Sequence, residues 1–172
     1  IDDNSAIPNS DLLCMQQLSS MNTVAIVKDE DGIYQRCQFS MIRNSTSGSY
    51  EGHLDQKEEL KGNAAMIEDA EYTVIDKLNG FLYFSIGNKL YTYRKGIDEC
   101  VEVNLQGVNF DPIVSLNVIA HNDYKANIFV ATYSETNKGK VYRLTPESTD
   151  SRNLTVEEVI DTEGAVKCIT YW

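Results

Sequence analysis

A short pattern recurs three times in this chain: an apolar β-type run, a polar turn and a return segment that ends in tyrosine. The three return segments are Gly32-Ile33-Tyr34, Lys89-Leu90-Tyr91 and Lys140-Val141-Tyr142. Their tyrosines are 57 and 51 residues apart. Hairpins that recur at such a spacing are typical of stacked repeats such as propeller blades. Because a blade cannot bury both of its faces alone, the repeat favours a scaffold or interaction surface over an enzyme.

Alternating and apolar runs predict two complete four-stranded units in the last hundred residues. The expected strands are 72–75, 81–85, 89–94 and 101–105, followed by 113–120, 127–133, 140–144 and 154–160. His121–Lys125 is the expected turn between the first two strands of the second unit. Residues 165–171 read as the opening strand of a further unit that is not otherwise present.

The first half of the chain predicts a less complete unit. Residues 1–10 form a loose leading segment, and residues 11–21 hold either a short strand or a helical turn. Residues 23–27 and 33–41 form a hairpin around an acidic turn. The charged segment 54–60 could hold one or two helical turns, ended by Gly62-Asn63.

The predicted fold class is therefore all-β, with about three propeller-like antiparallel blades plus one extra strand. Propellers usually close with four to eight blades. Residues 1–172 are thus expected to form a single β domain that is the C-terminal fragment of a longer chain, or one that completes its packing as a homo-oligomer. A β-sandwich accounts equally well for the number of strands and remains the alternative fold.

Composition excludes several classes of partner. A net charge of −11 opposes binding to nucleic acid or to anionic membranes, since both require an excess of Lys and Arg. No apolar run is long enough for direct membrane insertion. The four cysteines are widely spaced and contain no CxxC pair, so buried thiols are expected, with one disulfide left open.

No sequence motif for catalysis, a cofactor or a metal is present. His53 and His121 lack a metal-ligand spacing, and both read as solvated loop histidines. Counting from Asp29, the twelfth residue is Ser40 and not the glutamate that an EF-hand loop requires. Carboxylates adjacent in sequence point to opposite faces of a strand, which makes poor pairs for glycosidase chemistry. We therefore expect no enzymatic activity, no cofactor and no metal.

Two acidic loops, 28–32 and 121–124, are the candidate contact surfaces for a protein partner or a glycan. Their candidate ligand-binding residues are Asp29, Asp31, Asp123 and Tyr124. The recurring tyrosines Tyr34, Tyr91 and Tyr142 are instead interpreted as packing residues at equivalent repeat positions.

The segments Ile67–Ala70 and Phe81–Tyr93 resemble the C-terminal half of the Bacteroidetes PKD-like family lipoproteins. Val130–Tyr133 and Gly139–Tyr142 are similar to the next repeat of that family. The resemblance covers roughly residues 60–172 and implies a longer chain that begins with a lipoprotein signal and PKD-like domains. It further implies an exported protein of the outer membrane or cell surface, encoded near glycan-uptake systems. It supplies no catalytic residues.

These observations lead to one functional hypothesis and two alternatives. The hypothesis is a non-enzymatic binding or scaffold module of a bacterial cell-surface protein that is linked to glycan uptake and carbohydrate utilisation. One alternative is a glycoside-active enzyme that uses carboxylates at a central channel. The other is a purely structural spacer domain.

Overall fold

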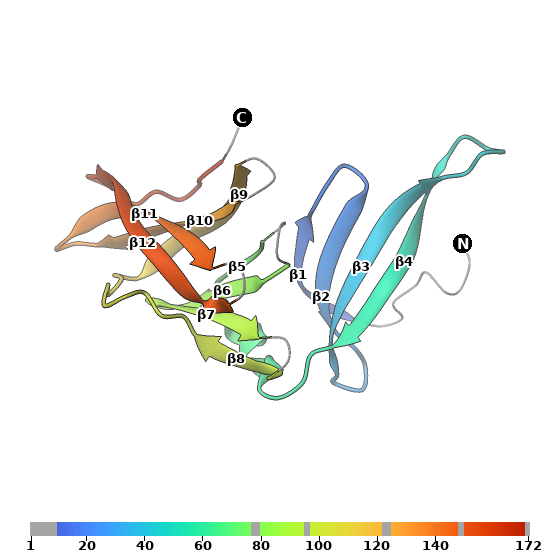
Figure 1. Ribbon diagram of the computed structural model, residues 1–172, viewed down its shortest axis with the longest axis horizontal. Coiled ribbons are helices and arrows are strands. Elements are labelled where there is room, and N and C mark those ends of the chain that lie inside the picture. The colour runs from blue at the N-terminus through green and yellow to red at the C-terminus, as the bar shows by residue number, and fades with distance from the viewer. Residues whose placement is uncertain (1–9, 77–79, 95–96, 122–124, 148–149, 171–172) are drawn as a thin grey trace. The chain divides into compact units, whose positions relative to one another are not determined.

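The computed structural model describes residues 10–76, 80–94, 97–121, 125–147 and 150–170 of the chain. Twelve strands and one 3₁₀ helix make up the secondary structure of this part (Figure 1). Their bounds are β1 Asp11–Gln17, β2 Asn22–Lys28, β3 Tyr34–Arg43, β4 Tyr50–Glu59, η1 Ala64–Asp69, β5 Tyr72–Ile75, β6 Leu82–Ile86, β7 Lys89–Arg94, β8 Glu99–Glu102, β9 Ile113–His121, β10 Lys125–Ser134, β11 Lys138–Glu147 and β12 Asp150–Thr162.

The strands form three four-stranded antiparallel sheets, and each sheet is a meander of strands consecutive in sequence. The sheets contain β1–β4, β5–β8 and β9–β12. The all-β class and the two four-stranded units of the last hundred residues are thus confirmed, whereas the first half, predicted as a less complete unit, forms a complete four-stranded sheet. Each recurring tyrosine lies on the third strand of its sheet: Tyr34 on β3, Tyr91 on β7 and Tyr142 on β11. The recurring pattern therefore corresponds to the central hairpin of each sheet.

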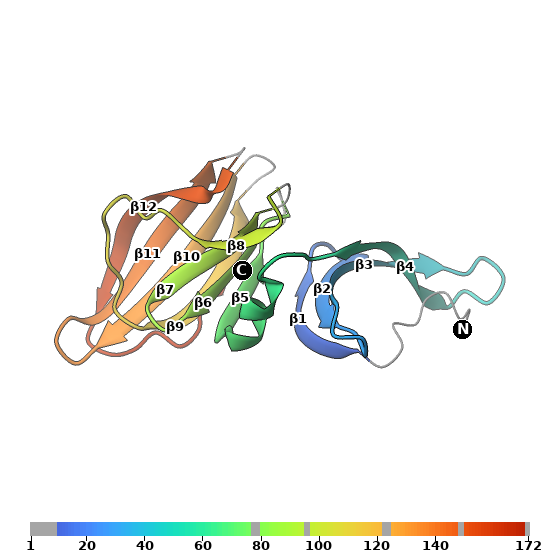
Figure 2. The ribbon, with the colours of Figure 1, turned by 90° about the horizontal axis from the view of Figure 1, so that it is seen from below.

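The chain divides into two compact units, Ile1–Glu68 and Asp69–Trp172. The N-terminal unit contains the sheet β1–β4, which curls along its strands (Figure 2). The C-terminal unit contains the other two sheets. Whether the two units act as one domain, as the sequence predicts, stays a prediction.

In the C-terminal unit, two sheets share one hydrophobic core. Val74, Tyr83 and Leu90 from β5–β7 pack in one cluster with Ile128, Val130 and Leu144 from β10 and β11. The Phe110 and Tyr142 rings lie 4.8 Å apart in this cluster. Each sheet therefore removes the apolar face of the other from water, which is the main stabilising term in such a fold.

Main-chain hydrogen bonds also join these two sheets. Asn104, just after β8, donates its N–H to the carbonyl of Arg152 at 2.7 Å and accepts from the N–H of Leu154 at 3.2 Å. Nearby, Arg94 Nε lies 3.5 Å from Asp150 Oδ1. The start of β12 is thereby fixed beside the end of β8.

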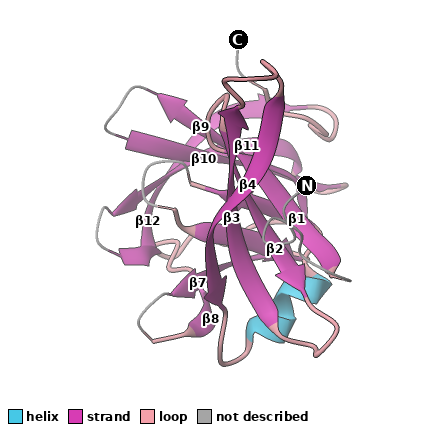
Figure 3. Ribbon diagram, turned by 90° about the vertical axis from the view of Figure 1, so that its right-hand side faces the viewer, coloured by secondary structure: helices cyan, strands magenta, loops and turns pink. Residues whose placement is uncertain are grey.

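The structure corrects two of the expected elements. Residues 54–60 are not helical, because residues 54–59 belong to the edge strand β4, which pairs with β3 along its length, and Leu60 directly follows this strand. The helix of this region is η1, from Ala64 to Asp69, with Ala64 and Ile67 buried (Figure 3). Residues 165–170 form no strand; Asn117 on β9 instead donates a side-chain hydrogen bond to the carbonyl of Ile169.

Three smaller differences concern loops and cysteines. His121 ends β9 and Lys125 begins β10, so the predicted turn is shorter than expected. The polar segment 44–52, whose Ser, Asn and Gly residues predict a loop, is a loop only over residues 44–49, because β4 starts at Tyr50. All four cysteines lie in the described part of the chain and none forms a disulfide, but only Cys37 and Cys100 are buried; Cys168 is exposed.

Gly139, at the start of β11, lies very close to the chain segment that follows β12. A Cβ atom at this position would lie 2.1 Å from Thr162 Oγ1 and 2.2 Å from the carbonyl oxygen of Gly164. The hydroxyl can rotate away but the backbone carbonyl cannot, so we expect Gly139→Ala to destabilise the chain by roughly 1–3 kcal/mol. Urea unfolding followed by circular dichroism measures this change.

Gly52→Ala is the matched control, since a Cβ atom there would meet nothing within 4 Å. Its free energy of unfolding should stay within about 1 kcal/mol of the original chain. Equal destabilisation by the two substitutions would contradict the close approach at Gly139.

Candidate functional site

The acidic turn between β2 and β3 contains two of the candidate binding residues. Asp29 is half-buried, and its Oδ1 accepts hydrogen bonds from the main-chain N–H groups of Asp31 at 3.1 Å and Ile33 at 2.9 Å. Its Oδ2 accepts from the side-chain amide of the buried Gln35. Asp29 is therefore a turn-forming residue, whereas the side chain of Asp31 is exposed.

Residues 122–124 of the second acidic loop lie outside the described residues, and His121 is the last residue of β9. Asp123 and Tyr124, its two candidates, stay predictions on that account. His53 is exposed on β4, where its Nδ1 lies 3.1 Å from the carbonyl oxygen of Leu54. Among the described residues, no group of three or more His, Cys, Asp or Glu side chains could hold a metal ion.

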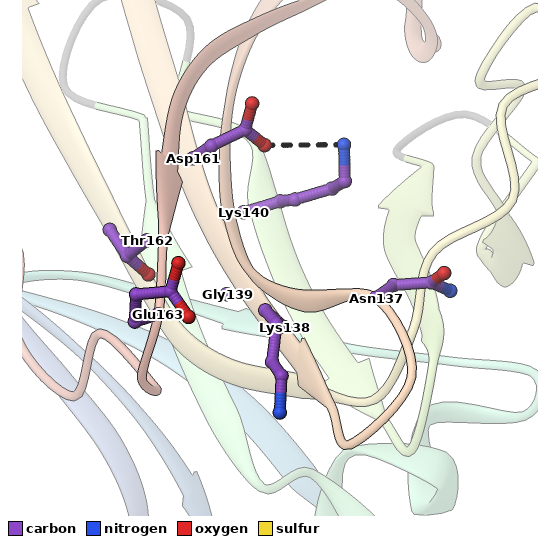
Figure 4. Close-up of a pocket in the computed structure, with 7 residues that line it drawn as sticks. All are labelled: Asn137, Lys138, Gly139, Lys140, Asp161, Thr162 and Glu163. Carbon is purple, nitrogen blue, oxygen red and sulfur yellow. Dashed lines mark ion pairs between the residues drawn. The ribbon is translucent and has the colours of Figure 1, made fainter.

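A polar hollow of about 310 Å³ lies where the β10–β11 turn meets the end of β12 (Figure 4). Its charged side chains are Lys138, Lys140, Asp161 and Glu163. Lys140 Nζ donates to both carboxylate oxygens of Glu158, at 2.8 and 2.9 Å, and lies 3.3 Å from Asp161 Oδ1. These contacts, chiefly the bond to Glu158, raise the pKa of the Lys140 ammonium. Because this ammonium is already neutralised by protein carboxylates, the hollow is a poor site for an anionic ligand.

The carboxylates that are adjacent in the sequence accept hydrogen bonds from basic or hydroxyl side chains in the structure. Glu157 accepts from Arg143 across the β11–β12 pair, and Glu158 from Lys140. Glu68, at η1, accepts from the Tyr34 hydroxyl and from Lys28 Nζ. The Tyr34 bond, followed by the Lys28 contact, lowers the pKa of Glu68. This cluster attaches η1 to the β2–β3 hairpin and involves Tyr34 in a hydrogen bond rather than in apolar packing.

Both faces of the sheet β1–β4 bury apolar residues: Val24 and Ile26 of β2 are buried on one face, and the other face, which we call the apolar face, continues to exposed side chains at its margins. The centre of the apolar face consists of the buried Ala25, Val27 and Cys37, with Phe39 and Leu54 packed against them. Burial raises the pKa of the Cys37 thiol. Paired strand residues share a face, so the register extends this surface in two directions.

At one end, the apolar face extends along the β3–β4 hairpin. Met41 pairs with Gly52, and Arg43 pairs with Tyr50, two and four residues beyond Phe39. Met41 is 43% and Tyr50 is 57% exposed. Gly52 lies between Tyr50 and Leu54 and has open space above it, so the Met41 and Tyr50 side chains border a position without a side chain. We call Met41, Tyr50 and Gly52 the hairpin surface.

At the other end, the apolar face extends onto β1. Leu12 pairs with Val27 and Met15 pairs with Ala25. An irregularity in register between Leu12 and Cys14 places Leu12 and Met15 on the same face although they are three residues apart. They are 59% and 65% exposed, the highest values among the large apolar side chains of the described residues.

Comparisons of this chain with protein families, with curated proteins and with solved structures find no match. In the part of the chain that the structure describes, no helix is both long and apolar enough to cross a membrane.

The two aspartates of the β2–β3 turn should respond differently to substitution. Asp29→Ala removes the acceptor of three hydrogen bonds, two of them from main-chain N–H groups, and should cost about 1–2 kcal/mol of unfolding free energy. Asp31→Ala removes an exposed carboxylate and should change stability by less than about 0.5 kcal/mol. Urea unfolding of both variants provides the comparison, and equal stabilities would show that Asp29 is not required for the turn.

Proposed function

We propose that this chain is a non-enzymatic binding or scaffold module whose N-terminal sheet binds a protein partner through the hairpin surface. The main support is the distribution of exposed apolar side chains. Of the eleven large apolar residues that the described part of the chain exposes, seven lie in the N-terminal unit. Four of these seven, Leu12, Met15, Met41 and Tyr50, lie on the apolar face, and exposed apolar residues gathered on one surface mark interaction sites in soluble proteins.

The composition of the hairpin surface favours a protein over other ligands. Tyr, Met and Arg are enriched at protein interfaces, and the hairpin surface presents Tyr50 and Met41 beside Arg43 on one face. A glycan would stack on an aromatic ring with several hydrogen-bonding groups around it. Here the nearest neighbours of Tyr50 on the face are Arg43 and the bare Gly52 position, a pattern suited to an apolar side chain entering from a partner.

A bacterial cell-surface setting is part of this proposal and rests on the resemblance to the PKD-like lipoproteins. In that setting, a module of antiparallel sheets would support a contact surface on a larger exported protein. The exposed Asp31 at the opposite end of β3 would add polar contacts.

The hairpin surface can be tested by blocking it without disturbing the fold. Gly52→Arg places a large cation in open space between Tyr50 and Leu54, and Tyr50→Lys removes the exposed ring. We expect the original chain to select apolar or aromatic peptides from a displayed peptide library, and both variants to lose this binding by about tenfold or more. Biolayer interferometry with the selected peptides measures the loss.

Tyr72→Lys is the matched control, because Tyr72 is an exposed tyrosine on β5 in the other unit. It should leave peptide binding unchanged. Retained binding by Gly52→Arg, or selective binding to a glycan array in place of peptides, would overturn the proposed protein-binding role.

A further inference from the structure

The end of the β3–β4 hairpin projects beyond the other two strands of its sheet (Figure 1). The last contacts with β2 are the pairing of Ser40 with Asn22 and the hydrogen bond that the N–H of Met41 donates to the carbonyl of Met21, at 2.8 Å. Beyond this point, β3 pairs with β4 alone in the described sheet. The hairpin surface therefore lies on a two-stranded ribbon, on which the side chains of Met41 and Tyr50 are exposed.

The loop at the tip of this ribbon is held by several hydrogen bonds. The N–H of Asn44 donates to the carbonyl of Ser49 at 2.8 Å, and the N–H of Gly48 donates to the carbonyl of Asn44 at 2.9 Å. The side-chain oxygen of Asn44 accepts from the main-chain N–H groups of Thr46 and Ser47. Because the loop is already closed, the ribbon loses little conformational freedom when it binds.

The hairpin surface places a large side chain beside a position that has none. Tyr50 is 57% exposed, and a Cβ atom at Gly52 would meet nothing within 4 Å. The two residues lie on the same face of β4, about 7 Å apart along the strand. A tyrosine ring that stands beside such a bare position fits the same bare position on an identical surface. The hairpin surface is therefore complementary to itself, as an interface with two-fold symmetry requires.

We propose that the protein partner of the hairpin surface is a second copy of this chain. This inference rests on the proposed function, since it names the occupant of the same surface. The two ribbons pack face to face and run in opposite directions. The two-fold axis lies between the two faces, at right angles to the strands and midway between Tyr50 and Gly52. Each Tyr50 ring then fills the space above the second copy's Gly52.

This arrangement gives each side chain of the surface a neighbour in the second copy. Arg43 pairs with Tyr50 and Met41 pairs with Gly52 across the ribbon, so the aliphatic part of Arg43 lies over the second copy's Met41. The two Tyr50 rings lie beside each other, which permits the offset arrangement that aromatic pairs favour. Because the ribbons run in opposite directions, the remaining strands of the two N-terminal sheets lie at opposite ends and only the ribbons overlap.

The charges of the ribbon permit this approach, although the chain has a net charge of −11. On the face that carries Met41 and Tyr50, the charged residue of the ribbon is Arg43. Glu51 pairs with Ile42 and therefore lies on the opposite face. Two acidic copies thus meet at a face without a ribbon carboxylate, and their repulsion acts at longer range. Association should therefore strengthen as salt screens this repulsion.

An exchange of large and small side chains tests the interface in the 172-residue chain. Tyr50→Ala removes the ring, and Gly52→Tyr fills the space that the ring enters. Each substitution alone should weaken the monomer–dimer equilibrium by about tenfold or more. In an equimolar mixture, the alanine at position 50 of one variant faces the tyrosine introduced at position 52 of the other. The mixture should therefore form a heterodimer about as stable as the original dimer. Sedimentation equilibrium of the original chain, each variant and the mixture measures these affinities.

Tyr72→Ala is the matched control, because Tyr72 is an exposed tyrosine on β5 in the other unit. It should leave the dimer unchanged. Since Tyr50 is exposed and position 52 borders open space, circular dichroism should report that both test variants are folded. The dimer of the original chain should also become more stable from low to high salt.

Three outcomes would overturn the inference. One is a chain that stays monomeric at every concentration and salt level. Another is a dimer that neither Tyr50→Ala nor Gly52→Tyr weakens. The third is a mixture that stays monomeric after each variant alone has lost the dimer, which would exclude the contact between Tyr50 and Gly52.

The inference and the proposed function fail separately. A monomeric chain whose selected peptides no longer bind after Gly52→Arg would retain the hairpin surface as a protein-binding site and reject the second copy as its occupant. A monomeric chain whose peptides still bind after Gly52→Arg would reject both.

Discussion

A four-stranded sheet has two faces and two edges. What packs against each apolar face, and so removes it from water, determines most of this structure. In the C-terminal unit, the sheets β5–β8 and β9–β12 cover one another through a single core that includes Tyr83, Ile128 and Leu144. Burial in this core also raises the pKa of the Tyr83 phenol. In the N-terminal unit, β2 is buried on both faces of a single sheet, and the apolar face around Ala25 and Val27 leaves Met15 and Tyr50 exposed at its margins.

The outer face of the sheet β9–β12 is covered in a different way. Ala131 and Val141 are paired on this face and are almost completely buried. Asn117, on the same face, holds the carbonyl of Ile169, and Gly139 allows Gly164 to approach. The segment after β12 thus lies against the sheet without pairing as a strand. One glycine determines whether this close packing is possible, which explains why a single added carbon atom is expected to be costly there.

Sequence alone predicted the C-terminal strands well, because alternation and turn residues agree there. Gly87-Asn88 and the apolar run from Ile113 specify both a turn and a buried strand. Prediction failed for residues 54–60, since the charges that protect an edge strand also resemble those of an exposed helix. It failed for residues 165–170 because an alternating segment becomes a strand only where a neighbouring edge is available. At the candidate site, the sequence identified Asp29 and Asp31 as part of an acidic turn. Their different roles depend on the hydrogen bonds that Asp29 accepts from the side chain of Gln35 and from nearby main-chain N–H groups.

The apolar margins of the N-terminal sheet could not be read from sequence for a more general reason. Leu12 and Met15 are three residues apart, a spacing that in a regular strand places side chains on opposite faces. Only the register irregularity on β1 brings them together. Met41 and Tyr50 likewise lie on the same face because β3 and β4 pair across a hairpin loop of six residues, 44–49. Such a surface is created by the register of strand pairing, so no single segment of the sequence predicts it. The same pairing places the charged β4 at one edge of the sheet and the bulged β1 at the other, so the two edges differ in what opposes pairing with a further strand: charge on β4 and a register irregularity on β1.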